Sequence, residues 1–238
     1  PLTTALSNTT LSGYVATSIQ YNPGMANDGT APNYSFGSKA NSVNLNVIDL
    51  SLDHPEAATP WAAGYHVDLW AGPDANGLNT SSSGFSFNDF AIRQAYLTLN
   101  TPVGNGIDWK VGVFDTIIGY EGLTSGNNPN YSRSYGFSME PTTHTGVLGT
   151  YKVNDEVTVQ AGLADTSTLG GGAYAATING ANGFGGYFGL NTPTVLADVS
   201  LTAPDNFGAI KGATLYGGVI TTGGNTGATS LYVGATTP

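Results

Sequence analysis

Charged side chains that could act on a passing solute gather in one polar segment, residues 119–143. The segment is rich in Gly, Asn and Pro, and it carries Glu121, Arg133 and Glu140. Long segments without regular structure are often functional. We predict that this one folds into a water-filled interior, where Arg133 pairs with a carboxylate to form a constriction that sorts solutes by size and charge. The alternative is a solvated surface loop in which Arg133 makes a local structural pair.

Few other charges are placed to line such an interior. Alternation along the expected strands assigns these to the polar face: His66, Asp68, Lys110, Lys152 and Asp198, with Gln94 and Tyr96 beside them. A mostly neutral lining with aromatic rings suits uncharged solutes such as sugars. The alternative, and the more common role for any single one of these groups, is a hydrogen bond to another across the interior.

Catalysis finds little support in the sequence. The three histidines, His54, His66 and His144, are widely separated and lack the spacing of metal ligands. No Gly-x-Ser-x-Gly elbow and no Walker loop is present, and the Gly run at 170–172 precedes no expected helix. We therefore predict no enzyme activity, no cofactor and no metal site.

The composition favours some classes of protein and argues against others. Only 9% of residues are charged, against roughly 25% in an average soluble domain, yet mean hydropathy is −0.05. Neutral polar groups can line water without the cost of burying charge, which suits a protein with one lipid face and one watery face. A net charge of −10 makes nucleic acid an unlikely partner, because phosphate contacts require a basic patch. The absence of Cys excludes disulfides.

Period-2 alternation over segments of about ten residues is the strongest structural pattern. Tyr65, Val67 and Leu69, for example, alternate with His66, Asp68 and Trp70. About eleven strands are expected, and the longer ones reach the ~9–11 residues that cross a bilayer. The expected strands are 11–21, 43–52 with a bulge near residues 48–49, 65–70, 94–99, 107–113, 147–153, 157–163, 184–191, 195–203, 210–221 and 229–235.

Short and long connections separate these strands. Tight polar turns are expected at 101–106, 153–157 and 191–194, and longer polar loops at 23–42, 73–88, 119–143 and 167–183. Short turns on one rim and long loops on the other are typical of outer-membrane barrels. Aromatics near strand ends indicate girdles at the lipid headgroups, although Tyr and Trp are also simply good strand formers. They are Tyr14, Tyr21, Trp61, Tyr65, Trp70, Trp109, Tyr151 and Tyr232.

No apolar run approaches the ~20 residues of a transmembrane helix, so a membrane-spanning form has to be a closed barrel. We predict an all-β fold, an antiparallel up-and-down transmembrane β-barrel forming one domain over residues 1–238. A soluble secreted β-sandwich acting as a binding module remains an alternative, because it also buries one face of each strand and wets the other. The chain opens at Pro1 without Met, and we expect a mature or trimmed form.

A family resemblance emerges between residues 90 and 150. The runs at 93–99 (RQAYLTL), 112–115 (GVFD) and 119–121 (GYE) resemble the β-barrel porins of the OmpL-like type, although Val113 stands where the family often has Lys. The runs at 128–134 (NPNYSRS) and 140–146 (EPTTHTG) are a more specific match. The resemblance implies an outer-membrane barrel with a pore, and it supplies no substrate and no catalytic residue. The candidates for the constriction or pore lining are Arg133, Glu121, Glu140, His144, Tyr131, Lys110 and Asp68.

Such barrels usually end in a strand with a terminal aromatic, and bacterial single-chain barrels have an even number of strands. The chain ends instead in Ala-Thr-Thr-Pro, so we expect the N-terminal portion of a larger barrel, incomplete at its C-terminus. We predict a channel of the bacterial outer membrane for passive diffusion of small hydrophilic solutes, with membrane lipid and these solutes as partners and a homo-oligomer as one arrangement. The alternative is a structural or adhesive barrel without an open pore.

Overall fold

The fold is described from a computed structural model of residues 1–238. The residues described are 8–21, 23, 41–57, 59–78, 89–164, 193–222 and 229–237. Within them, no helix has both the length and the apolar character needed to cross a membrane.

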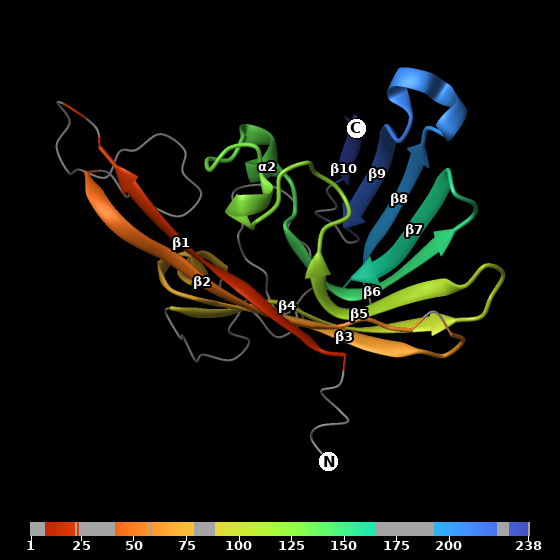
Figure 1. Ribbon diagram of the computed structural model, residues 1–238, viewed down its shortest axis with the longest axis horizontal. Helices are drawn as coiled ribbons and strands as arrows, with labels where there is room; N and C mark the ends of the chain where they lie inside the picture. The colour runs from red at the N-terminus through yellow and green to blue at the C-terminus, as the bar shows by residue number, and fades with distance from the viewer. Residues whose placement is uncertain are drawn as a thin grey trace, which may run out of the picture.

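Ten strands form one antiparallel sheet in which every strand pairs with its neighbours in sequence (Figure 1). They are β1 (Thr10–Gln20), β2 (Ser42–His54), β3 (Ala63–Ala71), β4 (Phe90–Thr101), β5 (Ile107–Asp115), β6 (Thr143–Lys152), β7 (Val157–Ala164), β8 (Thr194–Thr202), β9 (Thr214–Thr222) and β10 (Thr229–Thr236). This confirms the predicted all-β, up-and-down, barrel-type fold. The sheet is not closed, and β1 and β10 form its two edges. The eleventh expected strand, at 184–191, lies outside the described residues.

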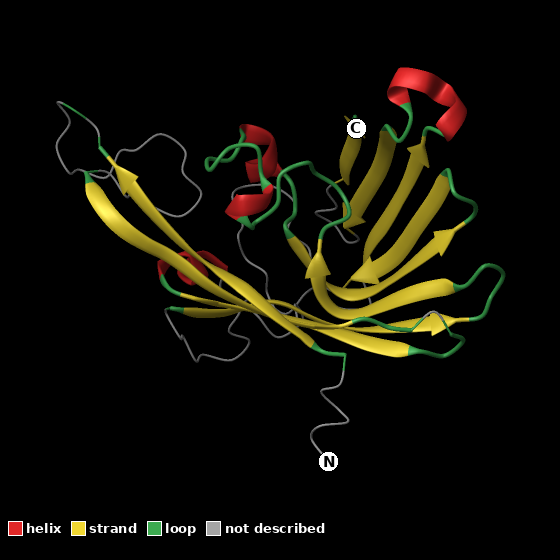
Figure 2. Cartoon of the chain, in the orientation of Figure 1, coloured by secondary structure: helices red, strands yellow, loops and turns green. Residues whose placement is uncertain are grey.

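Four connections lie at one rim of the sheet, among them the predicted tight turns at 101–106 and 153–157, whereas the turn predicted at 191–194 is not one of them because Thr194 begins β8. They join β2 to β3, β4 to β5, β6 to β7 and β8 to β9, and the last contains the 3₁₀ helix η3 (Asp205–Ile210). Ile210 therefore belongs to this turn and not to a strand. At the opposite rim, longer connections carry the 3₁₀ helices η1 (Pro73–Leu78) and η2 (Ser125–Asn127) and the short helix α2 (Tyr135–Met139) (Figure 2).

The sheet curves into a trough, and its convex face carries an exposed belt of aliphatic side chains. The members of this convex belt include Leu11, Val15, Leu97, Val111, Val147, Val159, Leu163, Val195, Val199, Leu215 and Val233, with exposed fractions between 38 and 79%. A β-sandwich would bury such rows against a second sheet. The described strands form a single sheet, so no second sheet covers the belt. This arrangement favours the barrel over the soluble sandwich.

Two β-bulges keep polar and charged side chains on the concave face. In β2, Val47 pairs with Ala16 while Leu45 pairs with Thr17, so Asn46 is the extra residue. The predicted phase shift is confirmed, but it lies at Asn46, two residues before the expected position. In β4, Gln94 pairs with Asp68 while Ile92 pairs with Leu69, which makes Arg93 the extra residue. Each bulge reverses the alternation that follows it.

The aromatic side chains divide between the two faces. Tyr65, Trp109 and Tyr151 lie on the convex face near the short-turn rim, and Trp61 is 67% exposed in the adjoining turn. These residues agree with the predicted girdle. Three others do not, because they face inward. Tyr14 pairs with inward-facing Asp49, Trp70 is 1% exposed in an interior cluster, and Tyr232 packs against a second interior cluster.

A pair of glycines marks a sharp bend between β4, β5 and β6. Gly112 has a φ of 135°, and it pairs with Gly146 across β5 and β6. A Cβ atom on Gly112 would lie 2.3 Å from the carbonyl oxygen of Ala95 on β4. Such glycine kinks let a sheet curve strongly, as barrel walls require.

The convex belt predicts opposite effects for a charge placed on neighbouring residues of β8. Val199→Arg puts a cation in the belt, and the free energy of unfolding in liposomes should fall by about 2 kcal/mol. Ser200→Arg puts the same charge on the concave face and should cost much less. Urea titrations of the two variants measure the difference, and equal losses would contradict the assignment of the faces.

Candidate functional site

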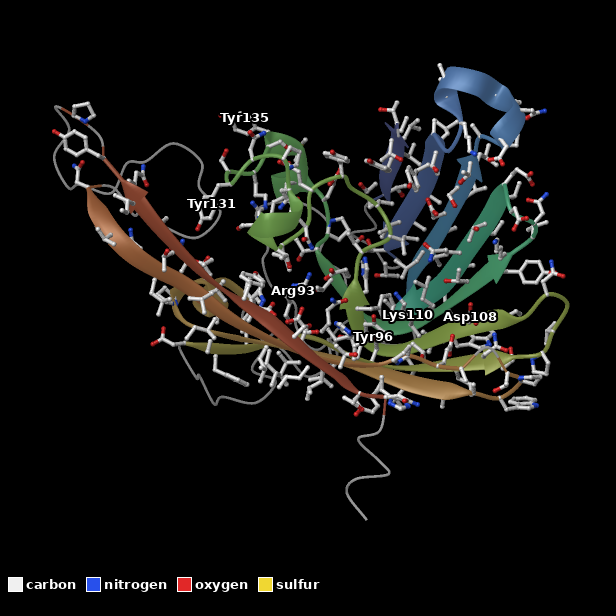
Figure 3. The ribbon with its side chains drawn as sticks, viewed as in Figure 1. Arg93, Tyr96, Asp108, Lys110, Tyr131 and Tyr135 are labelled. Atoms are coloured by element: carbon white, nitrogen blue, oxygen red, sulfur yellow. The ribbon has the colours of Figure 1, made fainter. Side chains whose placement is uncertain are left out.

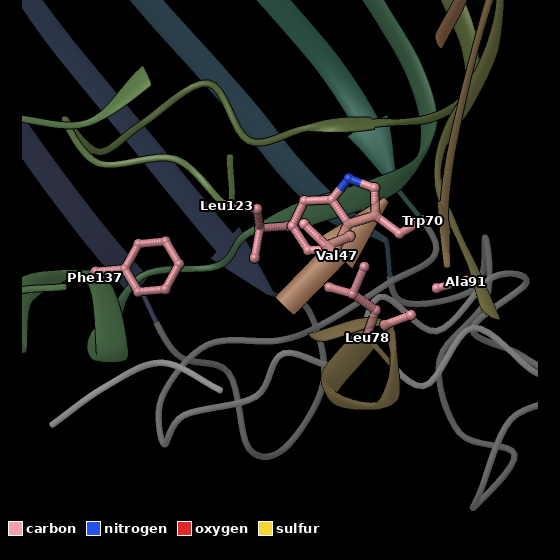
Figure 4. Close-up of a cluster of buried hydrophobic side chains, with 7 residues drawn as sticks. Val47, Trp70, Leu78, Ala91, Leu123 and Phe137 are labelled. Carbon is pink, nitrogen blue, oxygen red and sulfur yellow. The ribbon is translucent and has the colours of Figure 1, made fainter. Parts of the chain in front are cut away.

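The connection between β5 and β6, residues 116–142, lies on the concave side of the sheet (Figure 1). Two of its apolar side chains, Leu123 and Phe137, belong to a buried cluster with Val47 of β2, Trp70 of β3 and Leu78 of η1 (Figure 4). Burial of these groups anchors the segment to the wall formed by β2, β3 and β4. We call residues 116–142 the inner segment.

The inner segment also reaches the opposite wall. Ile118 belongs to a second buried cluster with Phe114, Leu148, Leu196 and Ile220, which come from β5, β6, β8 and β9. Ile118 also packs so closely over Gly218 of β9 that a Cβ on that glycine would lie 2.6 Å from its Cγ2. The segment therefore spans the concave space from β2 to β9, which is the inward fold expected of a constriction loop.

Arg133 holds the inner segment together from within. Its Nε donates to the Gly122 carbonyl at 2.9 Å, one Nη donates to the Tyr131 carbonyl at 2.7 Å, and the other donates to the Leu123 carbonyl at 2.7 Å and to Ser125 Oγ at 3.1 Å. Its guanidinium also lies over the Phe137 ring, and the side chain is buried. These partners differ from the carboxylate that the sequence suggested, and they make Arg133 an anchor of the segment.

Glu121, Glu140 and Tyr131 occupy other parts of the segment. Glu121 accepts from the backbone N–H of Ser134 at 2.9 Å and from its hydroxyl, which fixes the residue that caps α2. Burial, with a contribution from the nearby Glu121 carboxylate, raises the pKa of Glu140. The Tyr131 hydroxyl accepts a hydrogen bond from the Asn46 side chain at 2.5 Å, which ties the segment to the bulge in β2.

Asp68 belongs to a charge cluster that the sequence did not reveal as a whole. Arg93 donates to Asp68 Oδ2 and to Asp115 Oδ2, both at 2.8 Å, and its guanidinium lies 5.8 Å from the centroid of the Trp70 ring. The Trp70 indole N–H donates to Asp49 Oδ2 at 2.8 Å. Strict alternation would have placed Arg93 on the lipid side, where a cation costs about 2–4 kcal/mol. The cost of placing the Arg93 cation in lipid was therefore the one indication in the sequence that β4 contains a bulge.

Lys110 lies nearer the short-turn rim, in a row of inward side chains. Its ammonium is 5.0 Å from the centroid of the Tyr96 ring, which stacks on His66 at 5.1 Å (Figure 3). His66 Nδ1 is 3.1 Å from a carboxylate oxygen of Asp53. The predicted inward positions of Lys110, Tyr96 and His66 agree with this row. Lys152 instead lies at the rim, 62% exposed, and pairs with Asp155.

His144 does not reach the open part of the concave face. It is 1% exposed beneath the start of the inner segment, with Nε2 3.1 Å from the Thr116 hydroxyl and its ring tilted against Phe114. This burial leaves it no surface for a solute, so its position does not support a pore-lining role. Among the described residues, no group of three or more His, Asp or Glu side chains is arranged to hold a metal ion.

Comparison with known proteins gives one match. A family model described as "Putative beta-barrel porin-2, OmpL-like" matches residues 8–233. No curated protein and no solved structure matches the chain.

The charge cluster around Arg93 predicts a large effect of its removal. Arg93→Ala leaves two carboxylates without their cation, and the free energy of unfolding should fall by about 3–5 kcal/mol. Adding Asp68→Asn and Asp115→Asn should restore part of that loss, because the uncompensated charges are then removed. Urea unfolding of the variants in detergent micelles measures both effects.

Lys152→Ala, which breaks an exposed pair, is the matched control and should leave the unfolding midpoint unchanged. A loss of equal size in Arg93→Ala and Lys152→Ala would argue against a structural role of the buried cluster.

Proposed function

The chain belongs to the OmpL-like β-barrel porin-2 family, and on that premise we propose that it forms an outer-membrane channel for passive diffusion of small hydrophilic solutes. The observation that carries the proposal is the division of one sheet into two chemically different faces. The convex face offers a belt of exposed aliphatic side chains, while the concave face carries Asp53, His66, Lys110 and the Arg93 cluster. A barrel of this kind presents its apolar face to lipid and its polar face to water.

The inner segment is the proposed constriction. Its attachment to both walls through Leu123, Phe137 and Ile118 supports a fixed position across the channel. The bonds of Arg133 to three backbone carbonyls support a defined shape. Pore selectivity in channels depends on pore width and on the charges at the narrowest point, and both are set by a segment held in this way.

A barrel without an open pore is the second candidate, and one observation favours it. The two interior clusters beneath the inner segment are apolar and buried, so they fill part of the concave space with side chains. Planar-bilayer recordings distinguish the two candidates. A diffusion channel gives discrete, stable current steps, whereas a blocked barrel inserts without them.

Substitutions of Arg133 test the constriction. Both Arg133→Ala and Arg133→Lys should raise the single-channel current, because neither side chain can form the four bonds of the guanidinium, and each bond to a charged group is worth about 1.5–3 kcal/mol. The lysine variant keeps the positive charge, so it separates anchoring from electrostatics. An effect confined to Arg133→Ala would assign the role to the charge, and unchanged current in both variants would remove the inner segment as the constriction.

A further inference from the structure

We infer that the channel proposed above admits small cations in preference to anions. The inference rests on the proposed function, and it replaces the mostly neutral lining expected from the sequence. Its basis is an excess of carboxylates at three levels of the concave face, where most of the cationic groups are already engaged by other partners.

The first level is the mouth at the short-turn rim. The side chain of Asp53 is 49% exposed beside His66, and exposed Asp108 accepts from the Asn100 amide at 2.6 Å. Burial raises the pKa of Glu56, and the nearby Asp108 carboxylate raises it further. Lys110, two residues from Asp108 on the same face of β5, is the cation on the wall here, and it lies over the Tyr96 ring.

The second level is the middle of the sheet. The single charge of Arg93 is shared between Asp68 and Asp115, and Asp49 is a third carboxylate close enough to act on it. On the far wall, inward-facing Asp198 is 8% exposed, and no cation is paired with it among the described residues. Its Oδ2 and the Oδ1 of Asp68 are buried without a hydrogen-bond donor. Burial keeps these oxygens from direct contact with a solute, so any charge they carry acts on a passing cation or anion only through the electric field.

The third level is the inner segment itself. Four of the five N–H donors of Arg133 point to carbonyl and hydroxyl oxygens of the segment, which hold the guanidinium in place and leave its single positive charge against the two carboxylates of Glu121 and Glu140. Glu121 and Glu140 lie near one another, and repulsion from Glu121 is a cause of the raised pKa of Glu140. A path from the short-turn mouth to the segment therefore passes carboxylates at every level.

Two exposed ion pairs lie at the short-turn rim. Lys152 at the end of β6 pairs with Asp155 at 2.9 Å, Lys211 pairs with Asp205 at 3.0 Å, and all four side chains are exposed. Charges in these exposed pairs are screened by bulk solvent, whereas the carboxylates on the concave face act where water is confined and screening is weaker. Rings of Asp and Glu select for cations in channels by the same electrostatics.

The test is the reversal potential of the whole chain in a planar bilayer separating two KCl solutions of different concentration. Its sign should show that K⁺ is more permeant than Cl⁻, and the preference should shrink as ionic strength rises and the Debye length falls from about 10 Å at 0.1 M to about 3 Å at 1 M. Asp53→Asn and Asp108→Asn should each lower the K⁺/Cl⁻ permeability ratio by roughly fivefold, because one unit charge about 8 Å away in water changes the permeation of K⁺ and of Cl⁻ by about twofold or a little more each, in opposite directions.

Asp155→Asn and Asp205→Asn are the matched controls, since they remove the same charge from the exposed rim and should leave the ratio unchanged. Asp198→Asn tests the far wall and should also lower the ratio. Channels with no preference, or with a preference for Cl⁻, would overturn the inference while leaving the channel itself standing. An absence of current steps would overturn the proposed function and the inference together.

Discussion

Antiparallel pairing of the backbone across ten strands sends successive side chains to opposite faces, and every other feature of the molecule depends on how those faces are filled. Each strand from β2 to β9 is hydrogen-bonded to a neighbour on both sides, and such pairing is what lets a sheet exist in lipid. The two bulges keep polar and charged side chains on the concave face and aliphatic side chains on the convex face. Without the extra residue at Arg93, either its guanidinium or the aliphatic row that contains Leu97 would lie on the wrong face.

The polar face then has to satisfy its own charges, and it does so in two ways. At the level of Arg93, carboxylates and a guanidinium neutralise one another in part while leaving negative charge in excess. Toward the long-loop rim the concave face carries apolar side chains in place of charged ones. Ile118, Leu123 and Phe137 of the inner segment pack against them. The same inward face therefore both positions the segment and provides the charges that a solute would meet.

Alternation was sufficient to predict the fold class, most strands and the inward positions of Asp68, Tyr96 and Lys110. It could not locate the bulges, because a bulge is defined by pairing with the neighbouring strand, and so Arg93 was not assigned to the site. The length and composition of the inner segment marked it as a candidate, but the partners of Arg133 are backbone carbonyls, which every residue carries. Tyr14 and Trp70 were assigned to the girdle because residue type alone does not indicate a face.

The contact between the convex face and lipid is tested most directly by tryptophan fluorescence in bilayers whose acyl chains carry bromine. The chain has three tryptophans, so single-tryptophan variants can report Trp109 on the convex face and Trp70 on the concave face separately. Strong quenching of Trp109 with little quenching of Trp70 is expected. Equal quenching of both, or protection of Trp109, would contradict the assignment of the two faces and the channel built on it.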